Sequence, residues 1–261
     1  GFGTQTANII AGGYTGSYTN RTESYNGSSW SEVGDIPTNQ SAGEGAGTQT
    51  AGISFGGEVA PKSLSITWNG SSWTATPNMN TGRQYLAGFG TQTAAVAAGG
   101  SSPPVNATEE WNGSSWTTVN TLPTVRYSAT GVGILTAGLI YSGSPSAPTA
   151  TTEYDGTNWT AGGDLLYQAD GSSASGTQTD ALQMGGSPVS SLGGSSAKYN
   201  GTSWNATGSM ASGRAEGSGS PSGTGSTALV TNGSIQTSPT SHPAATEEYN
   251  TVNTIKTLTS S

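Results

Sequence analysis

The chain has 261 residues, with 7 Lys and Arg against 15 Asp and Glu, and its formal net charge is −8. So few basic residues exclude a nucleic-acid-binding surface, which needs clustered cations. Cysteine is absent, which excludes disulfides and thiolate metal sites, and no apolar run approaches the roughly 18 residues that span a bilayer. We therefore expect neither a nucleic-acid partner nor membrane insertion.

The amino-acid composition resembles that of a disordered chain in one respect only. Ile, Leu, Val and Phe make up 33 of the 261 residues, a fraction below the roughly 20% under which disorder is suspected. Disorder also needs high net charge, however, and only 8% of the residues are charged. A chain of Gly, Ser, Thr, Ala and Asn can fold if its backbones pack closely together.

The chain repeats itself from end to end. A tryptophan recurs every 43 to 45 residues, as Trp30, Trp73, Trp116, Trp159 and Trp204. An aromatic residue five positions earlier recurs as Tyr25, Trp68, Trp111, Tyr154, Tyr199 and Tyr249. The sequence Gly-Thr-Gln-Thr begins at Gly3, Gly47, Gly90 and Gly176, and altered copies begin at Gly133 and Gly223. These repeats predict a single domain of six units, at residues 1–39, 40–82, 83–125, 126–168, 169–213 and 214–261.

Within each unit the apolar residues alternate with a period of two, which is the period of a β-strand. After Gly-Thr-Gln-Thr, one face of the next strand is apolar, with Ile9, Ile53, Val96, Leu139 and Leu182 at one register. The opposite face carries small residues, as expected where another sheet presses close: Gly52, Ala95, Gly138 and Ala181. Turn signals at Thr-Gln, Gly-Gly and Asn-Gly divide each unit into four strands.

The segment WNGSSW, at 68–73 and again at 111–116, is predicted to be a hairpin tip. Asn-Gly favours a two-residue turn of type I′, because both central residues need positive φ. The alternative is an N-glycosylation acceptor, since Asn26, Asn69, Asn112 and Asn200 all lie in Asn-x-Ser/Thr. The turn is the better explanation, because the copy at Asp155 keeps the turn residues and loses the acceptor.

Six four-stranded units of this length predict an all-β, six-bladed β-propeller of antiparallel blades. The order of an Arg beginning the first strand, Gly-Gly closing the second, and an aromatic residue before a turn and a Trp resembles the kelch repeat. The combination with Gly-Thr-Gln-Thr and Asn-Gly-Ser-Ser-Trp is similar to kelch-like proteins encoded in marine bacteriophage genomes. Two units depart from the pattern, because Ser142-Gly143 replaces Gly-Gly and the last unit lacks the Trp. The resemblance implies a virion or tail-fibre protein, located in the virion or extracellular.

The connections that differ between units should all lie on one face of the propeller. In a four-stranded meander the second-to-third loop and the connection to the next unit emerge on the same side, and these are the segments that vary. Loops on a rigid scaffold commonly carry recognition, although neutral drift explains the same variation. The candidate ligand-binding residues on this face are Tyr14, Tyr18, Lys62 and His242.

The residues that recur with the repeat have structural and functional interpretations. A ring of tryptophans could stack on sugars, but packing between blades is the favoured reading. Arg83, Arg126 and Arg214 recur at one register and Glu110, Glu153 and Glu248 at another. We expect ion pairs between first and third strands, each contributing under about 1 kcal/mol if exposed.

Catalysis, cofactors and metals are not expected. A single His and no Cys leave no kelch-like copper oxidase site and no set with metal-ligand spacing. Paired carboxylates for glycoside hydrolysis stay open, because four acids lie outside the repeat pattern: Asp164, Asp170, Asp180 and Glu216. The leading hypothesis is a non-catalytic structural or receptor-recognising virion propeller that contacts other virion proteins or a host-surface glycan or protein, alone or as a homo-oligomer. A secreted lectin or glycan-active enzyme is the alternative.

Overall fold

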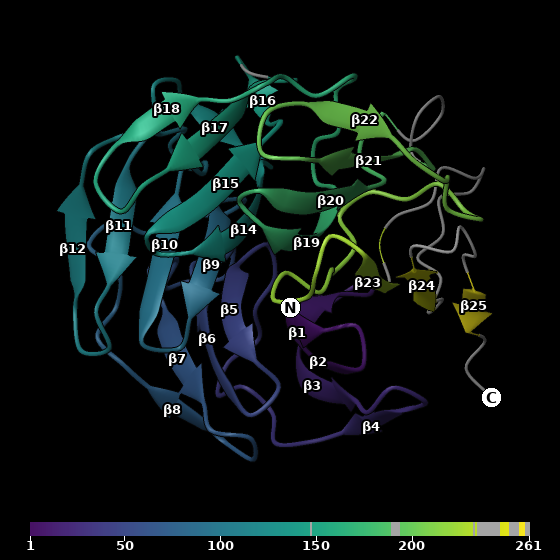
Figure 1. The fold of residues 1–261 in the computed structure, drawn as a ribbon. Helices are drawn as coiled ribbons and strands as arrows, with labels where there is room; N and C mark the ends of the chain where they lie inside the picture. The colour runs from purple at the N-terminus through teal and green to yellow at the C-terminus, as the bar shows by residue number, and fades with distance from the viewer. Residues whose placement is uncertain (147, 189–193, 232, 234–245, 251–255, 259–261) are drawn as a thin grey trace.

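A computed structural model of the chain describes residues 1–146, 148–188, 194–231, 233, 246–250 and 256–258. These residues form an all-β propeller of antiparallel sheets arranged around a central axis (Figure 1). In each four-stranded sheet the first strand lies nearest the axis and the fourth lies at the rim. The described part of the chain contains no helix, and so none that is long and apolar enough to cross a membrane.

Five of the sheets are four-stranded blades, each in meander order. Their strands are β1 (Phe2–Thr4), β2 (Ala7–Tyr14), β3 (Tyr18–Tyr25) and β4 (Trp30–Glu32) in blade 1; β5 (Glu44–Thr48), β6 (Ala51–Phe55), β7 (Ser65–Trp68) and β8 (Trp73–Ala75) in blade 2; β9 (Ala87–Thr91), β10 (Ala94–Ala98), β11 (Thr108–Trp111) and β12 (Trp116–Val119) in blade 3; β14 (Thr130–Ile134), β15 (Ala137–Tyr141), β17 (Thr151–Tyr154) and β18 (Trp159–Ala161) in blade 4; and β19 (Ser173–Thr177), β20 (Asp180–Met184), β21 (Ser196–Tyr199) and β22 (Trp204–Ala206) in blade 5. A two-stranded ribbon of β13 (Arg126–Tyr127) and β16 (Ser144–Pro145) accompanies blade 4.

The prediction of six four-stranded blades is wrong in the last unit. Its sheet has three strands in the described residues, β23 (Thr227–Thr231), β24 (Thr246–Asn250) and β25 (Lys256–Leu258). The expected innermost strand is replaced by the segment 218–225, in which Ser220 bridges Ser175 of blade 5 in parallel and Gly223 N–H closes a turn on the Ser220 carbonyl at 2.8 Å. Pro221 lacks a backbone donor and several glycines surround it, so this segment is poorly suited to an inner strand.

The Trp and Gln residues of the repeat join the four-stranded blades to the sheets that precede them. Each repeated indole Nε1 donates to a Ser or Thr hydroxyl of the preceding sheet, on the third strand of blades 1 to 4 and on β24 of the last sheet: Trp30 to Thr246, Trp73 to Thr22, Trp116 to Ser65, Trp159 to Thr108 and Trp204 to Thr151. The Gln of Gly-Thr-Gln-Thr donates to a carbonyl of the preceding third strand: Gln5 to Tyr249, Gln49 to Tyr25, Gln92 to Trp68 and Gln178 to Tyr154. The tryptophans therefore serve packing between blades.

The ring closes between β23–β25 and blade 1 with these same contacts. Trp30 Nε1 lies 3.2 Å from Thr246 Oγ1, and Gln5 Nε2 lies 3.1 Å from the Tyr249 carbonyl oxygen. Because both bonds repeat those of the other interfaces, the last sheet meets the first as an ordinary neighbour.

The hairpin tips differ from the predicted turn in length. Tyr25 pairs with Trp30 across the tip, so four residues form the loop. Only the glycine has positive φ (95° at Gly70), and Asn69 instead uses its Oδ1 atom to accept the backbone N–H groups of Ser71 and Ser72, at 3.0 and 2.9 Å. The predicted two-residue turn is therefore wrong, because the Asn acts by local side-chain hydrogen bonding.

Side-chain size is matched across the interfaces near the axis. Phe2 of blade 1 lies over Gly52 of blade 2, where an added Cβ would lie 2.2 Å from the Phe2 ring. Phe89 lies over Gly138 in the same way, at 2.1 Å. At the equivalent positions of the interface between blades 2 and 3, two alanines meet, Ala46 and Ala95, in one buried cluster. A glycine therefore occupies this register where the preceding blade supplies a Phe.

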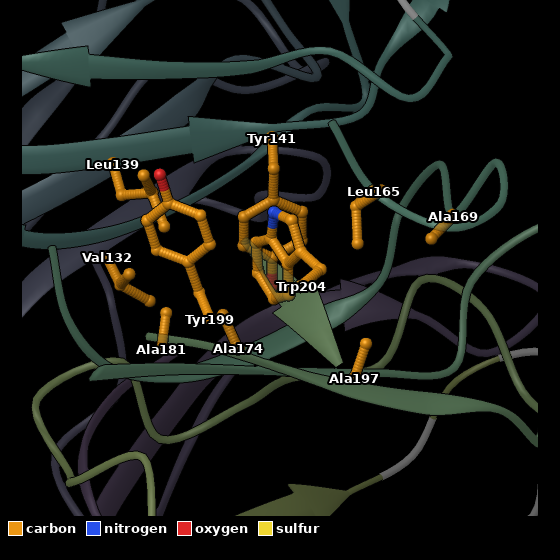
Figure 2. Packing of buried hydrophobic residues seen from close by; sticks show 10 residues of the cluster. All are labelled: Val132, Leu139, Tyr141, Leu165, Ala169, Ala174, Ala181, Ala197, Tyr199 and Trp204. Atoms are coloured by element: carbon orange, nitrogen blue, oxygen red, sulfur yellow. The ribbon is translucent and has the colours of Figure 1, made fainter. Parts of the chain in front are cut away.

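The aromatic residues pack between neighbouring blades, as Figure 2 shows for blades 4 and 5. The Trp204 ring lies between Tyr141 of blade 4, at 4.8 Å and 69°, and Tyr199 of its own blade, at 5.1 Å and 40°. Tilted and edge-on aromatic pairs stabilise the protein beyond the effect of burying apolar surface. A few large residues at each interface can therefore hold neighbouring sheets together.

The repeated arginines are buried, and their partners differ from those expected. Arg83 pairs with Glu109 at 2.8 Å, and both side chains are fully buried; Arg214 pairs with Glu247 in the same way. Arg126 donates instead to Thr152 Oγ1 at 2.7 Å. The predicted partners have another role: Glu110, Glu153 and Glu248 accept hydrogen bonds from Tyr154, Tyr199 and Tyr25 of the adjacent blade.

Candidate functional site at the channel mouth

The propeller has a cavity of about 1120 Å³ where the central channel opens between the varying connections. Its walls are the residues that precede the first strands, the ends of the second strands, and the loops that follow them. We call this cavity the channel mouth. A cavity of this size is slightly larger than most small-molecule sites, which measure about 300–1,000 Å³.

A belt of backbone hydrogen bonds lines the channel mouth from the second unit to the sixth. Near the start of each unit from the third to the sixth, one backbone N–H donates to the carbonyl of the equivalent residue in the preceding unit. The four bonds measure 2.7–2.9 Å and run from Tyr85 to Ala42, Ser128 to Tyr85, Gly171 to Ser128 and Glu216 to Gly171. The belt satisfies the backbone groups where the chain leaves the sheets, so it holds these residues in place without using their side chains.

The five belt residues share a backbone conformation and differ in side chain. Their φ angles lie between 52° and 61°, in the left-handed region that non-glycine residues seldom adopt. All five line the channel mouth: Ala42, Tyr85, Ser128, Gly171 and Glu216. Such conformations in non-glycine residues gather at functional sites. The belt thus presents unlike side chains from one repeated backbone position.

An extended hairpin of blade 1 adds two exposed tyrosines to the channel mouth. Strands β2 and β3 have 8 residues each, longer than their counterparts in the other blades. Tyr14 and Tyr18 pair across its end, with ring centroids 5.3 Å apart and an angle of 60°. Their exposed fractions are 52% and 39%, so both rings keep a free surface for a ligand. Gln40 ties the hairpin to the next connection, accepting from Gly13 N–H at 2.7 Å.

Carboxylates lie close to these tyrosines. Desolvation, then the charge and hydrogen bonding of Glu58, raise the pKa of Tyr18. Desolvation, then the charges of Glu58 and Glu216, raise the pKa of Tyr85. At the wall nearer the axis, desolvation raises the pKa of Glu44 to about 7. The channel mouth is thus an acidic and aromatic surface.

The structure brings together two of the four predicted site residues. Tyr14 and Tyr18 both line the channel mouth. Lys62 lies outside its lining, where the Nζ atom donates to Gln84 Oε1 at 3.1 Å. His242 lies outside the described residues.

Sequence reasoning missed Glu58 and Tyr85 at this site. Glu58 begins the second-to-third loop of its unit, which was expected to vary, but its sequence context does not distinguish it from the other residues of that loop. Tyr85 belongs to a connection between blades, and comparing the residues at 42, 85, 128, 171 and 216 would have found it, because they recur at nearly the same step as the tryptophans.

Of the four acids outside the repeat pattern, Asp170 and Asp180 have structural partners. Asp170 accepts from Ser142 Oγ at 2.9 Å and from Gly143 N–H at 3.1 Å, which holds the loop that departs from Gly-Gly. Asp180 pairs with Lys198 at 3.0 Å. Asp164 is exposed and does not line the cavity, whereas Glu216 does. In the described ranges no group of three or more His, Asp or Glu residues is placed to hold a metal ion.

Comparison with known proteins adds no relative: no protein-family model matches the chain, and no curated protein sequence matches it. The propeller fold therefore rests on the structure, and the likeness to kelch repeats rests on the residues that carry it.

Proposed function

We propose that this chain is a non-catalytic recognition propeller of a bacteriophage virion, kelch-like in its repeat, and that it contacts a host-surface glycan through the channel mouth. The observation that carries the proposal is the arrangement of Tyr14, Tyr18 and Tyr85 around a cavity of about 1120 Å³. Aromatic rings with free faces stack on sugars, and carboxylates such as Glu58 hydrogen-bond hydroxyl groups. The virion location is supported by the resemblance of the repeat to phage-encoded kelch-like proteins.

The different positions of the recurring and the variable side chains support a recognition role. Side chains that recur, such as the Trp and Gln residues, are occupied by contacts between sheets. The side chains that differ line the cavity, on a backbone that the belt holds fixed. Binding sites on rigid scaffolds are built in this way, because the scaffold keeps its stability while the surface changes.

A glycan-active enzyme is the second candidate. Glu58 and Glu216 both act on Tyr85 from the cavity wall, and two carboxylates facing one cavity are what glycoside hydrolysis needs. Other virion proteins are a further class of partner for the same face.

A glycan array with the purified chain, combined with a reducing-end assay on the polysaccharides bound, tests the proposal. We expect binding without turnover, and at least a tenfold loss of binding in the double variant Tyr14→Ala/Tyr18→Ala, about 1.4 kcal/mol. Because both rings are exposed, the free energy of unfolding of this variant should stay within about 0.5 kcal/mol of wild type. Release of reducing ends would make the chain an enzyme, and a binding signal unchanged in the double variant would move the site away from the channel mouth. Mass spectrometry of purified particles tests the virion location separately.

A further inference from the structure

The charges at the channel mouth point to the class of glycan, and this inference rests on the proposed function. Among the described residues, its lining contains four carboxylates and one basic side chain: Glu23, Glu44, Glu58, Glu216 and Arg21. The basic group is already paired, because Arg21 Nε lies 3.4 Å from Glu32 Oε1. Among the described residues, Glu58 and Glu216 therefore form no ion pair with a basic side chain.

The positions of the tyrosines strengthen this preference. Glu58 influences both Tyr18 and Tyr85, and Glu216 influences Tyr85, so the carboxylates and rings occupy one part of the wall. A cation over an aromatic face is attracted by the ring quadrupole, and a nearby carboxylate adds direct attraction. A neutral sugar would gain from stacking alone, and an acidic sugar would be repelled.

The shape of the site favours a saccharide over a single cationic side chain. The cavity of about 1120 Å³ is larger than one ammonium group fills. The rings of Tyr14 and Tyr18, with centroids 5.3 Å apart and planes inclined at 60°, are exposed and offer apolar surface to more than one sugar ring. We propose that the channel mouth binds a glycan whose sugars carry free amino groups, with Tyr14 and Tyr18 stacking on the rings and Glu58 and Glu216 binding the ammonium groups.

Isothermal titration calorimetry with two matched probes tests this assignment. The first probe is a glucosamine tetrasaccharide and the second is its fully N-acetylated counterpart, which has the same rings without the charge; a tetralysine peptide is the third arm. We expect the glucosamine probe to bind at least about tenfold more tightly than the N-acetylated one at low salt. This advantage should shrink at about 1 M salt, where the Debye length falls to about 3 Å.

Variants that remove negative charge at the channel mouth or on the opposite face locate the effect. Glu58→Gln/Glu216→Gln should lower the affinity for the glucosamine probe to that of the N-acetylated one. The control, Asp155→Asn, removes one negative charge from a hairpin tip on the opposite face, where the equivalent residue is Asn in other copies, and should bind as wild type. Thermal unfolding of each variant confirms that the fold is kept.

Three outcomes would overturn the assignment: equal affinity for the two saccharides, no measurable binding of the glucosamine probe, or tighter binding of tetralysine than of the saccharide. Equal affinity that is lost in Tyr14→Ala/Tyr18→Ala would remove the preference for amino groups and leave the proposed glycan recognition intact. Tighter tetralysine binding would indicate a protein partner instead.

Discussion

The interfaces between blades and the channel mouth use the same repeat in opposite ways. At the interfaces the side chain recurs, because each one has a partner in the preceding sheet, as Trp73 has in Thr22. At the channel mouth the backbone recurs and the side chain does not, because the belt between residues such as Tyr85 and Ser128 is made of main-chain atoms alone. The difference indicates that repetition in this sequence marks residues that stabilise the fold. Substitutions at the interfaces and inside the blades should therefore lower the free energy of unfolding strongly, whereas substitutions at the channel mouth should change it little.

The largest loss of stability is expected from breaking the buried pair in blade 3. Glu109→Ala leaves the guanidinium of Arg83 buried without its carboxylate, and we expect a loss of about 3–5 kcal/mol in the free energy of unfolding. Glu109→Thr copies the Arg126 and Thr152 arrangement of blade 4 and should lose less. Urea unfolding of the two variants measures the difference, and equal losses would show that the hydroxyl of blade 4 does not stabilise its arginine.

The next largest effect concerns the match of Phe and Gly between blades. Gly138→Ala places a methyl group against the ring of Phe89, and overpacking of this kind costs about 1–3 kcal/mol. The double variant Phe89→Ala/Gly138→Ala recreates the Ala46 and Ala95 pair, so the methyl group should then stabilise the protein relative to Phe89→Ala alone. A double-mutant cycle measures the effect of Gly138→Ala on the free energy of unfolding with Phe89 present and with Phe89→Ala. An equal loss in both backgrounds would contradict the match in size between Phe89 and Gly138.

A smaller effect, which depends on pH, is expected at the Tyr and Glu contacts between blades. Burial, then the hydrogen bond and charge of Glu153, raise the pKa of Tyr199 from its usual 10 to about 12. The folded protein therefore keeps a proton that the unfolded chain releases, and stability falls as the pH rises from about 10 to 12. Tyr199→Phe should cost about 1 kcal/mol at neutral pH and make this alkaline loss less steep. Unfolding curves at several alkaline pH values check both effects, and parallel losses in the two proteins would contradict the assignment to Tyr199.

Most of the fold can be predicted from the sequence, but only part of the candidate site can, because the two depend on different kinds of contact. The alternation around Ile53 and the turn residues at Gly-Thr-Gln-Thr depend on neighbours along the chain, so they predict strands and meander order. The last unit departs from the prediction because Ser220, next to Pro221, pairs with Ser175 of blade 5, and that contact is not local. Tyr14 and Tyr18 were found because they flank one loop, whereas Glu58 and Tyr85 meet only once the units are arranged in a ring.

The smallest change is expected at the hairpin tips, where one copy already carries the substitution. Asp155 accepts the backbone N–H groups of Thr157 and Asn158 at 2.8 and 2.6 Å, and these bonds lower its pKa. A carboxylate thus performs the same local role as the amide of Asn69, and Asn69→Asp should change the free energy of unfolding by less than about 0.5 kcal/mol. Asn69→Ala removes the acceptor and should cost about 1 kcal/mol. Thermal unfolding of the two variants compares them, and a larger loss for Asp than for Ala would mean that the tip tolerates its charge only in the surroundings of blade 4.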